Sequence, residues 1–402
     1  MFTSRLASQP IFLSILCSPH GGIATYVLGL LEAQSSHGSA IALAYTCGRA
    51  DPAFTFKVGS LASLTSRTIL HLQTHKLPTF KSISDLVTLL IFCREHTSAR
   101  DVVLIAHGTS SAGLALVVSL LFKRCRFFYI PHGGVSHLYN SKNPLLRLCV
   151  FLYDKLLSSL GARFLCESRY TYDLYSSLSS SNPYLFVEPY GYVYSLPQDL
   201  LLQIGAKRLS SSRSHALGLS SPVHEDPFTI IYLGTWRVIK GAVHLLRVLE
   251  LMGPQHATLP NGRPIRFMLY TDLACSCKFS LSEDGPKVSF HPWSSDVPSV
   301  LRSADAQIIP SRGESFGYAA IEALAARVPI IHTNVGGLKE ILSGTFMPIL
   351  SVDFTASDLY RAILNISSNS FDQLLGPSDP LQGIVDRSFW AQHPDFLSSS
   401  WS

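Results

Sequence analysis

Charged residues are scarce in this chain, and so are long hydrophobic runs. Asp, Glu, Lys and Arg make up only 15% of the 402 residues, whereas hydrophobic residues make up 47%. This balance excludes disorder as the main character of the chain. The longest apolar runs, residues 113–122 and 11–17, fall well short of the ~20 residues that a membrane-spanning helix needs. The composition therefore predicts globular domains and no spanning helix.

A strong charge of either sign is missing as well. The formal net charge is +5 at pH 7, which suits an anionic ligand or an anionic bilayer surface, and equally a solvated basic face. The spacing of Lys and Arg does not suggest nucleic-acid binding. A nucleic-acid partner is therefore not expected.

The eight cysteines do not form a disulfide framework. They are scattered through apolar segments, as at Cys17, Cys149 and Cys166, so the reducing cytoplasm is the predicted location. Cys275 and Cys277 form a lone Cys-x-Cys without a second ligand pair nearby. Loop thiols are therefore favoured over a structural zinc.

The apolar run at residues 11–17 has two interpretations. It follows Arg5 and could be the apolar part of a short signal peptide, but no small-residue cleavage site comes after it. A buried first strand is favoured.

Short β-rich runs alternate with longer amphipathic runs, which predicts an α/β protein with parallel sheets and crossover helices. The expected strands are residues 11–17, 40–45, 102–106, 127–130, 163–166, 185–187, 229–233, 266–269, 287–290, 306–309 and 329–332. Doubly wound sheets bind ligands beyond the carboxyl ends of their strands. We therefore expect two Rossmann-like domains facing a cleft.

A boundary between the domains is expected in residues 206–227, which are rich in serine, glycine and proline and are typical of a linker. This places one domain at residues 1–205 and the other at 228–366. Residues 367–402 read as an irregular tail. The second domain is expected to end in a shortened or truncated form there.

Residues 310–340, PSRGESFGYAAIEALAARVPIIHTNVGGLKE, contain the most informative pattern in the chain. On a helix over 315–326, Glu314 and Glu322 would lie on nearly the same face, roughly 12 Å apart. Ser315, Phe316 and Gly317 would open that helix, and their free N–H groups would form a phosphate site. The pattern predicts a nucleotide-sugar site, and its alternative is a helix with two solvated glutamates.

This stretch resembles the signature of the retaining GT-B glycosyltransferases of family four, the glycosyl transferases group 1. Their pattern is two glutamates separated by seven residues, then a Pro-Val-Ile-like strand and a Gly-Gly turn. Other segments resemble the family in order and approximate distance: Gly21 to Tyr26, His107-Gly108, Pro131-His132-Gly133 and Gly234 to Gly241. The resemblance spans roughly residues 11–341.

The resemblance assigns roles on the donor side. It makes the second domain the nucleotide-sugar-binding domain, with Lys240 and Arg237 as phosphate ligands beside the Ser315, Phe316 and Gly317 amides. Glu314 would hold the donor sugar and Glu322 the ribose. In the first domain, Gly21 and Gly22 would bind the donor through a helix N-terminus.

The resemblance also assigns the acceptor side to the first domain. His132 follows an apolar strand and precedes two glycines, so it is expected to project into the cleft and bind the acceptor, with His107 nearby. The catalytic residues would be Glu314, His132 and Lys240. A structural role for either histidine is the alternative.

Two departures from the family pattern stand out. Thr235 occupies the position where the family has Arg, and Arg237 would point to the opposite face if the strand continued. Reduced activity, an altered donor or no catalysis are all left open. Arg327 stands where a glycine is usual and should change only the turn. No Asp-x-Asp occurs, so neither a metal nor another cofactor is expected.

Residues 143–159 form a strongly apolar helix with Arg147 and Lys155. Packing against the sheet is favoured, and peripheral contact with the inner membrane face is the alternative. The resemblance implies a hexosyltransferase of polysaccharide biosynthesis that moves a sugar to a glycan or a lipid-linked acceptor. The alternatives are a nucleotide-sugar-binding protein without turnover and a nucleotide-sugar epimerase.

Overall fold

A computed structural model describes residues 10–17, 21–36, 40–46, 55, 58–59, 68–72, 80–98, 100–132, 143–178, 226–271, 281–294, 296–377 and 380–381. The chain divides into two compact units. Among the described residues, those up to Leu178 form the N-terminal unit and those from Asp226 form the C-terminal unit.

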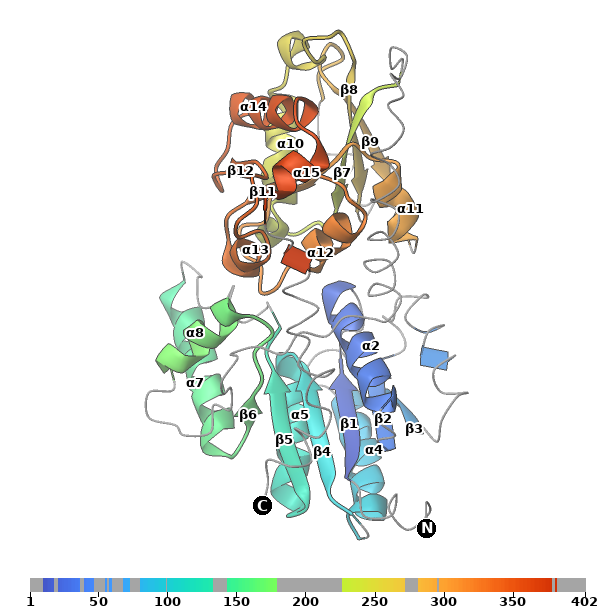
Figure 1. Cartoon of the computed structure of the whole chain (residues 1–402). Helices are drawn as coiled ribbons and strands as arrows, with labels where there is room; N and C mark the ends of the chain where they lie inside the picture. Colours follow the sequence, from blue (N-terminus) through green and yellow to red (C-terminus); the bar gives the residue numbers. More distant parts are fainter. Residues whose placement is uncertain are drawn as a thin grey trace. The chain divides into compact units, whose positions relative to one another are not determined.

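The N-terminal unit is built on a parallel sheet whose described strands have the order β3-β2-β1-β4-β5-β6 (Figure 1, blue to green). The strands are β1 (Ile11–Leu16), β2 (Ala40–Thr46), β3 (Thr68–Leu72), β4 (Val102–His107), β5 (Cys125–Ile130) and β6 (Arg163–Phe164). The helices are α2 (Gly21–Ser36), α4 (Phe80–Thr97), α5 (Thr109–Leu121), α7 (Pro144–Ser159) and α8 (Arg169–Leu178).

The C-terminal unit is a second parallel sheet, with the order β12-β11-β10-β7-β8-β9 (Figure 1, yellow to red). The strands are β7 (Phe228–Leu233), β8 (Ile265–Tyr270), β9 (Lys287–His291), β10 (Ala306–Ile309), β11 (Ile330–Thr333) and β12 (Ile349–Leu350). The helical segments are η2 (Val238–Lys240), α10 (Ala242–Glu250), η3 (Pro254–His256), α11 (Val297–Arg302), α12 (Tyr318–Ala325), α13 (Gly336–Ile341), α14 (Ala356–Ser367) and α15 (Phe371–Leu375).

The two sheets share one topology, which fixes where a ligand site can form. In each unit the first strand lies between the second and the fourth. The order in which successive strands are added to the sheet therefore changes direction at β1/β4 and at β7/β10. Ligands of doubly wound sheets bind beyond the carboxyl ends of the strands at this switch point. In the C-terminal unit, β7 leads to η2 and β10 leads to the loop that contains Glu314.

Three of the four strands next to the switch points are buried along their whole length, and β7 is buried except at Leu233. Every residue of β1, β4 and β10 is buried. Such strands read as continuous apolar runs, as in IFLSIL and VVLIAH, because a parallel sheet is covered on both faces. The sequence therefore identified these strands within one residue at either end.

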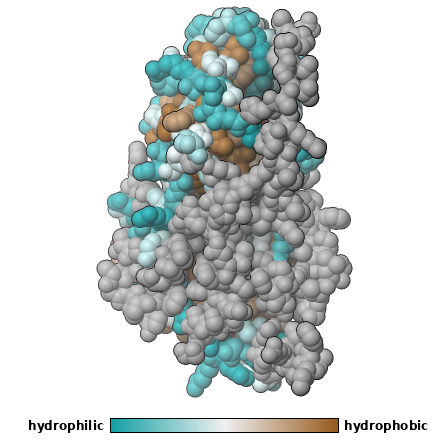
Figure 2. Space-filling model, viewed as in Figure 1, coloured by the Kyte–Doolittle hydropathy of each residue, from teal (hydrophilic) through white to brown (hydrophobic). Residues whose placement is uncertain are grey.

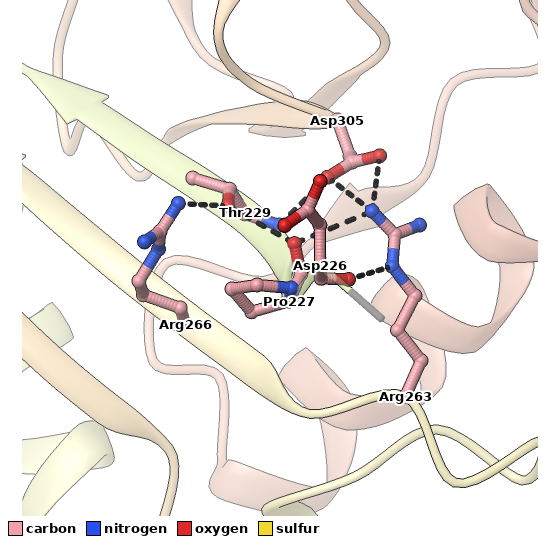
Figure 3. Close-up of polar contacts among 6 residues, drawn as sticks. All are labelled: Asp226, Pro227, Thr229, Arg263, Arg266 and Asp305. Atoms are coloured by element: carbon pink, nitrogen blue, oxygen red, sulfur yellow. Dashed lines mark hydrogen bonds and ion pairs between the residues drawn. The ribbon is translucent and has the colours of Figure 1, made fainter. Parts of the chain in front are cut away.

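A polar cluster fastens the amino ends of β7 and β10, away from the switch-point loops (Figure 3). The Arg263 guanidinium donates to Asp305 at 3.0 Å and to the Asp226 carbonyl at 2.7 Å. Asp305 also accepts from the Thr229 backbone N–H at 2.8 Å, and Arg266 donates to the Thr229 hydroxyl at 2.9 Å. These bonds tie the start of the sheet to the loop before β8.

Some predicted elements differ from the structure, and other predictions concern residues outside the described ranges. β3 and the short β12 were not predicted, and α15 lies in the tail that was expected to be irregular. The expected strand at 185–187, residues 206–225 of the linker, and Cys275 and Cys277 lie outside the described residues. The linker and domain boundaries therefore stay predictions.

Helix α7 has an exposed apolar stripe. Leu145, Leu148, Leu152 and Leu156 on α7 are each more than half exposed, and their spacing puts them on one face of the helix. The visible face of the C-terminal unit instead intermixes hydrophilic and hydrophobic residues (Figure 2). None of the described helices combines the length and the apolar character that crossing a bilayer requires.

Candidate functional site

The switch point of the C-terminal unit brings together a lysine and a carboxylate from two different motifs. Lys240 ends η2 after β7, and Glu314 lies in the loop after β10, 74 residues later. The Lys240 Nζ and the Glu314 Oε2 are 2.6 Å apart. The Ser311 hydroxyl also donates to this oxygen, at 3.4 Å. The expected neighbourhood of Lys240 and Glu314 is present.

Close backbone packing fixes the two loops against each other. Gly241 has φ +71°, and a Cβ there would lie 1.8 Å from the Pro310 carbonyl oxygen. The Arg312 N–H donates to the Ile239 carbonyl at 2.8 Å. Only glycine tolerates both that conformation and that approach. Lys240 is therefore held by its neighbour Gly241 in the position from which it reaches Glu314.

The loop after β11 closes on Glu314 from another side. Gly336 has φ +51°, and a Cβ there would lie 1.8 Å from the Glu314 carbonyl oxygen. The Gly337 N–H donates to that same oxygen at 2.9 Å. The Thr333 hydroxyl donates to the Ser311 carbonyl. Gly336 and Gly337 thus bring their backbone close to the protein's own Glu314 loop.

Helix α12 begins later than expected. It runs from Tyr318 to Ala325, and Gly317 precedes it with φ +111°, in the left-handed region. Ser315 and Phe316 therefore do not open the helix, and Phe316 is 3% exposed. The expectation was wrong because Gly317 turns the chain before the first helical turn, so Glu314 stands in a loop while Glu322 lies half-buried on α12.

Arg237 lies in the loop between β7 and η2. β7 ends at Leu233, and the Arg237 N–H donates to the Thr235 carbonyl at 2.8 Å. The strand therefore does not continue to Arg237, so the side-chain alternation that would turn Arg237 away does not apply. Its side chain is exposed and makes no ion pair with a described residue. This leaves a second cation, three positions from Lys240, able to meet an anion.

The usual glycine after α12 is replaced by Arg327, and the structure shows what this residue does. Arg327 has φ +56°, its guanidinium pairs with Asp372, and it lies 4.8 Å from the centre of the Phe371 ring. A non-glycine residue in this region carries backbone strain. Arg327 thus changes more than the turn, because it also contacts α15.

In the N-terminal unit, the predicted site residues follow the carboxyl ends of β1, β4 and β5. Gly21 and Gly22 begin α2. His107 ends β4 and His132 follows β5 with φ +39°. Their rings stack with centroids 5.3 Å apart, and the His107 Nδ1 is 3.1 Å from the His132 Nε2. The topology has brought the two histidines together.

Both histidines are buried, 2% and 7% exposed for His107 and His132, where a projecting His132 was expected. Burial lowers the pKa of His132 to about 3. Burial and then the neighbouring His132 lower the pKa of His107 well below its usual value. Both rings are therefore neutral at pH 7.

Sequence reasoning missed Glu167. Its carboxylate is 2% exposed, accepts from the His132 backbone N–H at 3.2 Å, and lies 3.5 Å from the His132 Nδ1. The signal was an acid directly after the apolar Phe164-Leu165-Cys166 segment. Ser311 and Thr333 were also missed, because serine and threonine near strand ends are too common to single out.

Solved structures share this fold. Two Rossmann-like parallel sheets of this topology make up the GT-B fold of glycosyltransferases. Sucrose-phosphate synthase from Thermosynechococcus elongatus superposes with a TM-score of 0.65 at 17% identity, covering 97% of this chain and 98% of that one. HepE of Anabaena, in complex with UDP and glucose, gives 0.66 at 14% identity, covering 96% and 99%.

The match to a family model lies in the C-terminal unit. Residues 227–369 match the family described as glycosyl transferases group 1. The D-inositol 3-phosphate glycosyltransferase of Corynebacterium kroppenstedtii is 26% identical over 208 residues, which are 48% of this chain and 44% of that protein. An uncharacterized glycosyltransferase of Methanocaldococcus jannaschii is 36% identical over 74 residues, 18% and 21% of the two chains. The chain thus matches less than half the length of these relatives.

Proposed function

We propose that this chain is a glycosyltransferase that takes a sugar from a nucleoside diphosphate sugar. The observation that carries the proposal is the meeting of Lys240 and Glu314 at the β7/β10 switch point. A sugar diphosphate needs a cation for its phosphates and hydrogen-bond acceptors for its hydroxyls. One lysine and one carboxylate within 2.6 Å offer both.

The donor would lie across the three loops that surround Glu314. Lys240 and Arg237 would neutralise the diphosphate, each charge-assisted hydrogen bond contributing about 1.5–3 kcal/mol. Glu314 would accept from the sugar hydroxyls and Glu322 from the ribose. The crystal structures of HepE with UDP and with UDP-glucose support a nucleotide sugar as the ligand of this fold.

We also propose transfer with retention and without a metal. Glu314 is held by Lys240 and Ser311, an arrangement that suits binding better than proton abstraction. The leaving phosphate would then take the acceptor's proton on the face from which it departs. The absence of Asp-x-Asp from the sequence supports phosphate neutralisation by Lys240 and Arg237.

The acceptor would bind the N-terminal unit, close to His132. A glycan or a lipid-linked glycan is the proposed acceptor class. The exposed leucine stripe of α7, with Arg147 and Lys155 on the same helix, favours peripheral contact with an anionic bilayer at the cytoplasmic face. Val150, Tyr153 and Leu157 pack α7 against the core, as predicted, but this packing does not account for the leucines that are more than half exposed.

A second candidate is a nucleotide-sugar-binding protein without turnover. Thr235 favours it, because it stands where the resembling family has an arginine. One phosphate contact would be lost unless Arg237 supplies it.

The test is to incubate the protein with a panel of nucleotide sugars, with and without glycan acceptors, and to measure nucleoside diphosphate release. We expect acceptor-dependent release that Lys240→Ala lowers by about 100-fold or more, the loss of one preorganised contact to transition-state charge. Lys287→Ala, an exposed lysine on β9, is the matched control. Binding without release would support the second candidate, and neither binding nor release would refute both.

A further inference from the structure

A buried chain of three side chains lies behind the acceptor side of the N-terminal unit. Glu167 contacts His132 twice, through the backbone N–H and opposite the ring Nδ1, and the His132 Nε2 contacts the His107 Nδ1. The edge of the His132 ring also meets Tyr26 of α2, with centroids 5.0 Å apart. Four elements therefore meet around one imidazole.

The contacts around His132 decide which ring nitrogen carries the proton. The Glu167 Oε2 already accepts from the His132 backbone N–H and lies 3.5 Å from the His132 Nδ1, which is therefore the nitrogen that carries the proton. In a neutral imidazole the other nitrogen is then an acceptor. The His132 Nε2 accordingly accepts from the His107 Nδ1–H. The His107 Nε2 is left as an acceptor, and no described residue donates to it.

The reverse arrangement conflicts with the same contacts. With its proton on Nε2, His132 would turn a lone pair toward the Glu167 carboxylate. His107 would then carry a proton on its buried Nε2, which has no acceptor among the described residues. An unsatisfied buried donor costs free energy.

We propose that Glu167 is a positioning residue that holds His132 as the Nδ1–H tautomer, so that the His132 Nε2 acts only as a hydrogen-bond acceptor. The partner of this nitrogen must be a donor. That donor is His107 in the present structure, and, resting on the proposed function, it is an acceptor-sugar hydroxyl during turnover. A carboxylate or phosphate at this position is disfavoured.

The backbone of His132 supports this role. A histidine at φ +39° is strained, and its N–H is bonded to Glu167 itself. One carboxylate therefore holds both the conformation of the residue and the orientation of its ring. Glu167→Gln keeps the shape of the side chain and removes the charge, which makes it the informative substitution.

The first experiment measures the tautomer directly, by ¹⁵N NMR of the full chain labelled in its histidines, with the His132 signals assigned from His132→Gln. We expect the Nδ1–H tautomer in the wild type and a visible Nε2–H population in Glu167→Gln. Asp173→Asn, an exposed carboxylate of α8, is the control and should change nothing. An Nε2–H tautomer in the wild type overturns the proposal, whether or not the variant folds or the protein transfers sugar.

The second experiment separates positioning from general structure. In the transfer assay, Glu167→Gln should lower kcat by about 10- to 100-fold, the range known for carboxylates that orient histidines at metal sites. The donor KM should stay unchanged, because Lys240, Arg237 and Glu314, the proposed ligands of the donor's phosphates and sugar, lie in the C-terminal unit. An unchanged kcat with the tautomer altered would refute the role in turnover. A raised donor KM with kcat intact would refute positioning.

Discussion

At the scale of single residues, the pairing of Lys240 with Glu314 has a consequence for ligand binding. The Glu314 carboxylate already pairs with the Lys240 ammonium group, which is the group that a diphosphate would contact. Glu314→Gln should therefore bind a nucleoside diphosphate about 2- to 5-fold tighter, as expected for removing a partly exposed ion pair, while sugar transfer is lost. Titration calorimetry checks this.

Glu283→Gln, an exposed acid elsewhere in the C-terminal unit, is the matched control for that measurement. Its affinity for the nucleoside diphosphate should equal that of the wild type. Weaker binding by Glu314→Gln would mean that the carboxylate supports the cation site instead of competing for it.

Gly336 tests how the Glu314 loop is held. Gly336→Ala places a Cβ where the Glu314 carbonyl oxygen now lies, so the turn must shift and nucleotide binding should be lost. Gly262→Ala is the matched control, because Gly262 also has positive φ but open space around it. The control should cost only about 1–2 kcal/mol of backbone strain, measured by urea unfolding, with binding unchanged. Equal effects of the two substitutions would argue against the close packing.

The two histidines give a pH prediction. Their pKa values are lowered in the folded state, so the unfolded chain binds more protons below its ordinary histidine pKa of about 6.5. The contribution of the two histidines to the free energy of unfolding of the N-terminal unit is then fully present above pH 6.5. It falls as the pH drops toward 3, by up to about 1.4 kcal/mol per pH unit for each histidine. Urea midpoints at several pH values should fall less steeply in His132→Gln. Parallel curves would contradict the burial of a neutral ring.

At the scale of elements, the cluster of Arg263 and Asp305 should matter for folding and not for the site. It joins the amino ends of β7 and β10, opposite the loops that hold Lys240 and Glu314. Asp305→Asn should lower the free energy of unfolding of the C-terminal unit by about 1–3 kcal/mol and leave nucleotide affinity unchanged. Arg361→Ala, which breaks an exposed pair on α14, should cost about 0–1 kcal/mol.

Elements differ in how far the sequence could predict them. Strands buried on both faces, such as β4 and β10, are continuous apolar runs and were found within a residue. β3 and β12 both lie at a sheet edge; β3 was missed because Thr68 and His71 interrupt its apolar run, and β12 because it has only two residues. The start of α12 was misplaced because Gly317 adopts a left-handed conformation that the sequence leaves open.

At the scale of the whole molecule, the shared topology of the two units explains why motifs far apart in the sequence come together. Each motif follows a strand, and the sheet order collects the ends of β7 and β10 at one place. The contact of Glu167 with His132 joins the ends of β5 and β6. No spacing along the chain reveals which acid approaches which ring, so the contact of Glu167 with His132 could not be predicted from the sequence.

The central claim is that Lys240, beside Glu314, binds the diphosphate of a nucleotide. Titration calorimetry of the full chain with UDP and other nucleoside diphosphates, for the wild type and Lys240→Ala, tests it most directly. We expect an affinity weaker by about tenfold or more in Lys240→Ala, from the loss of one charge-assisted contact, and an unchanged affinity in Lys287→Ala. Equal affinities of the wild type and Lys240→Ala would contradict it.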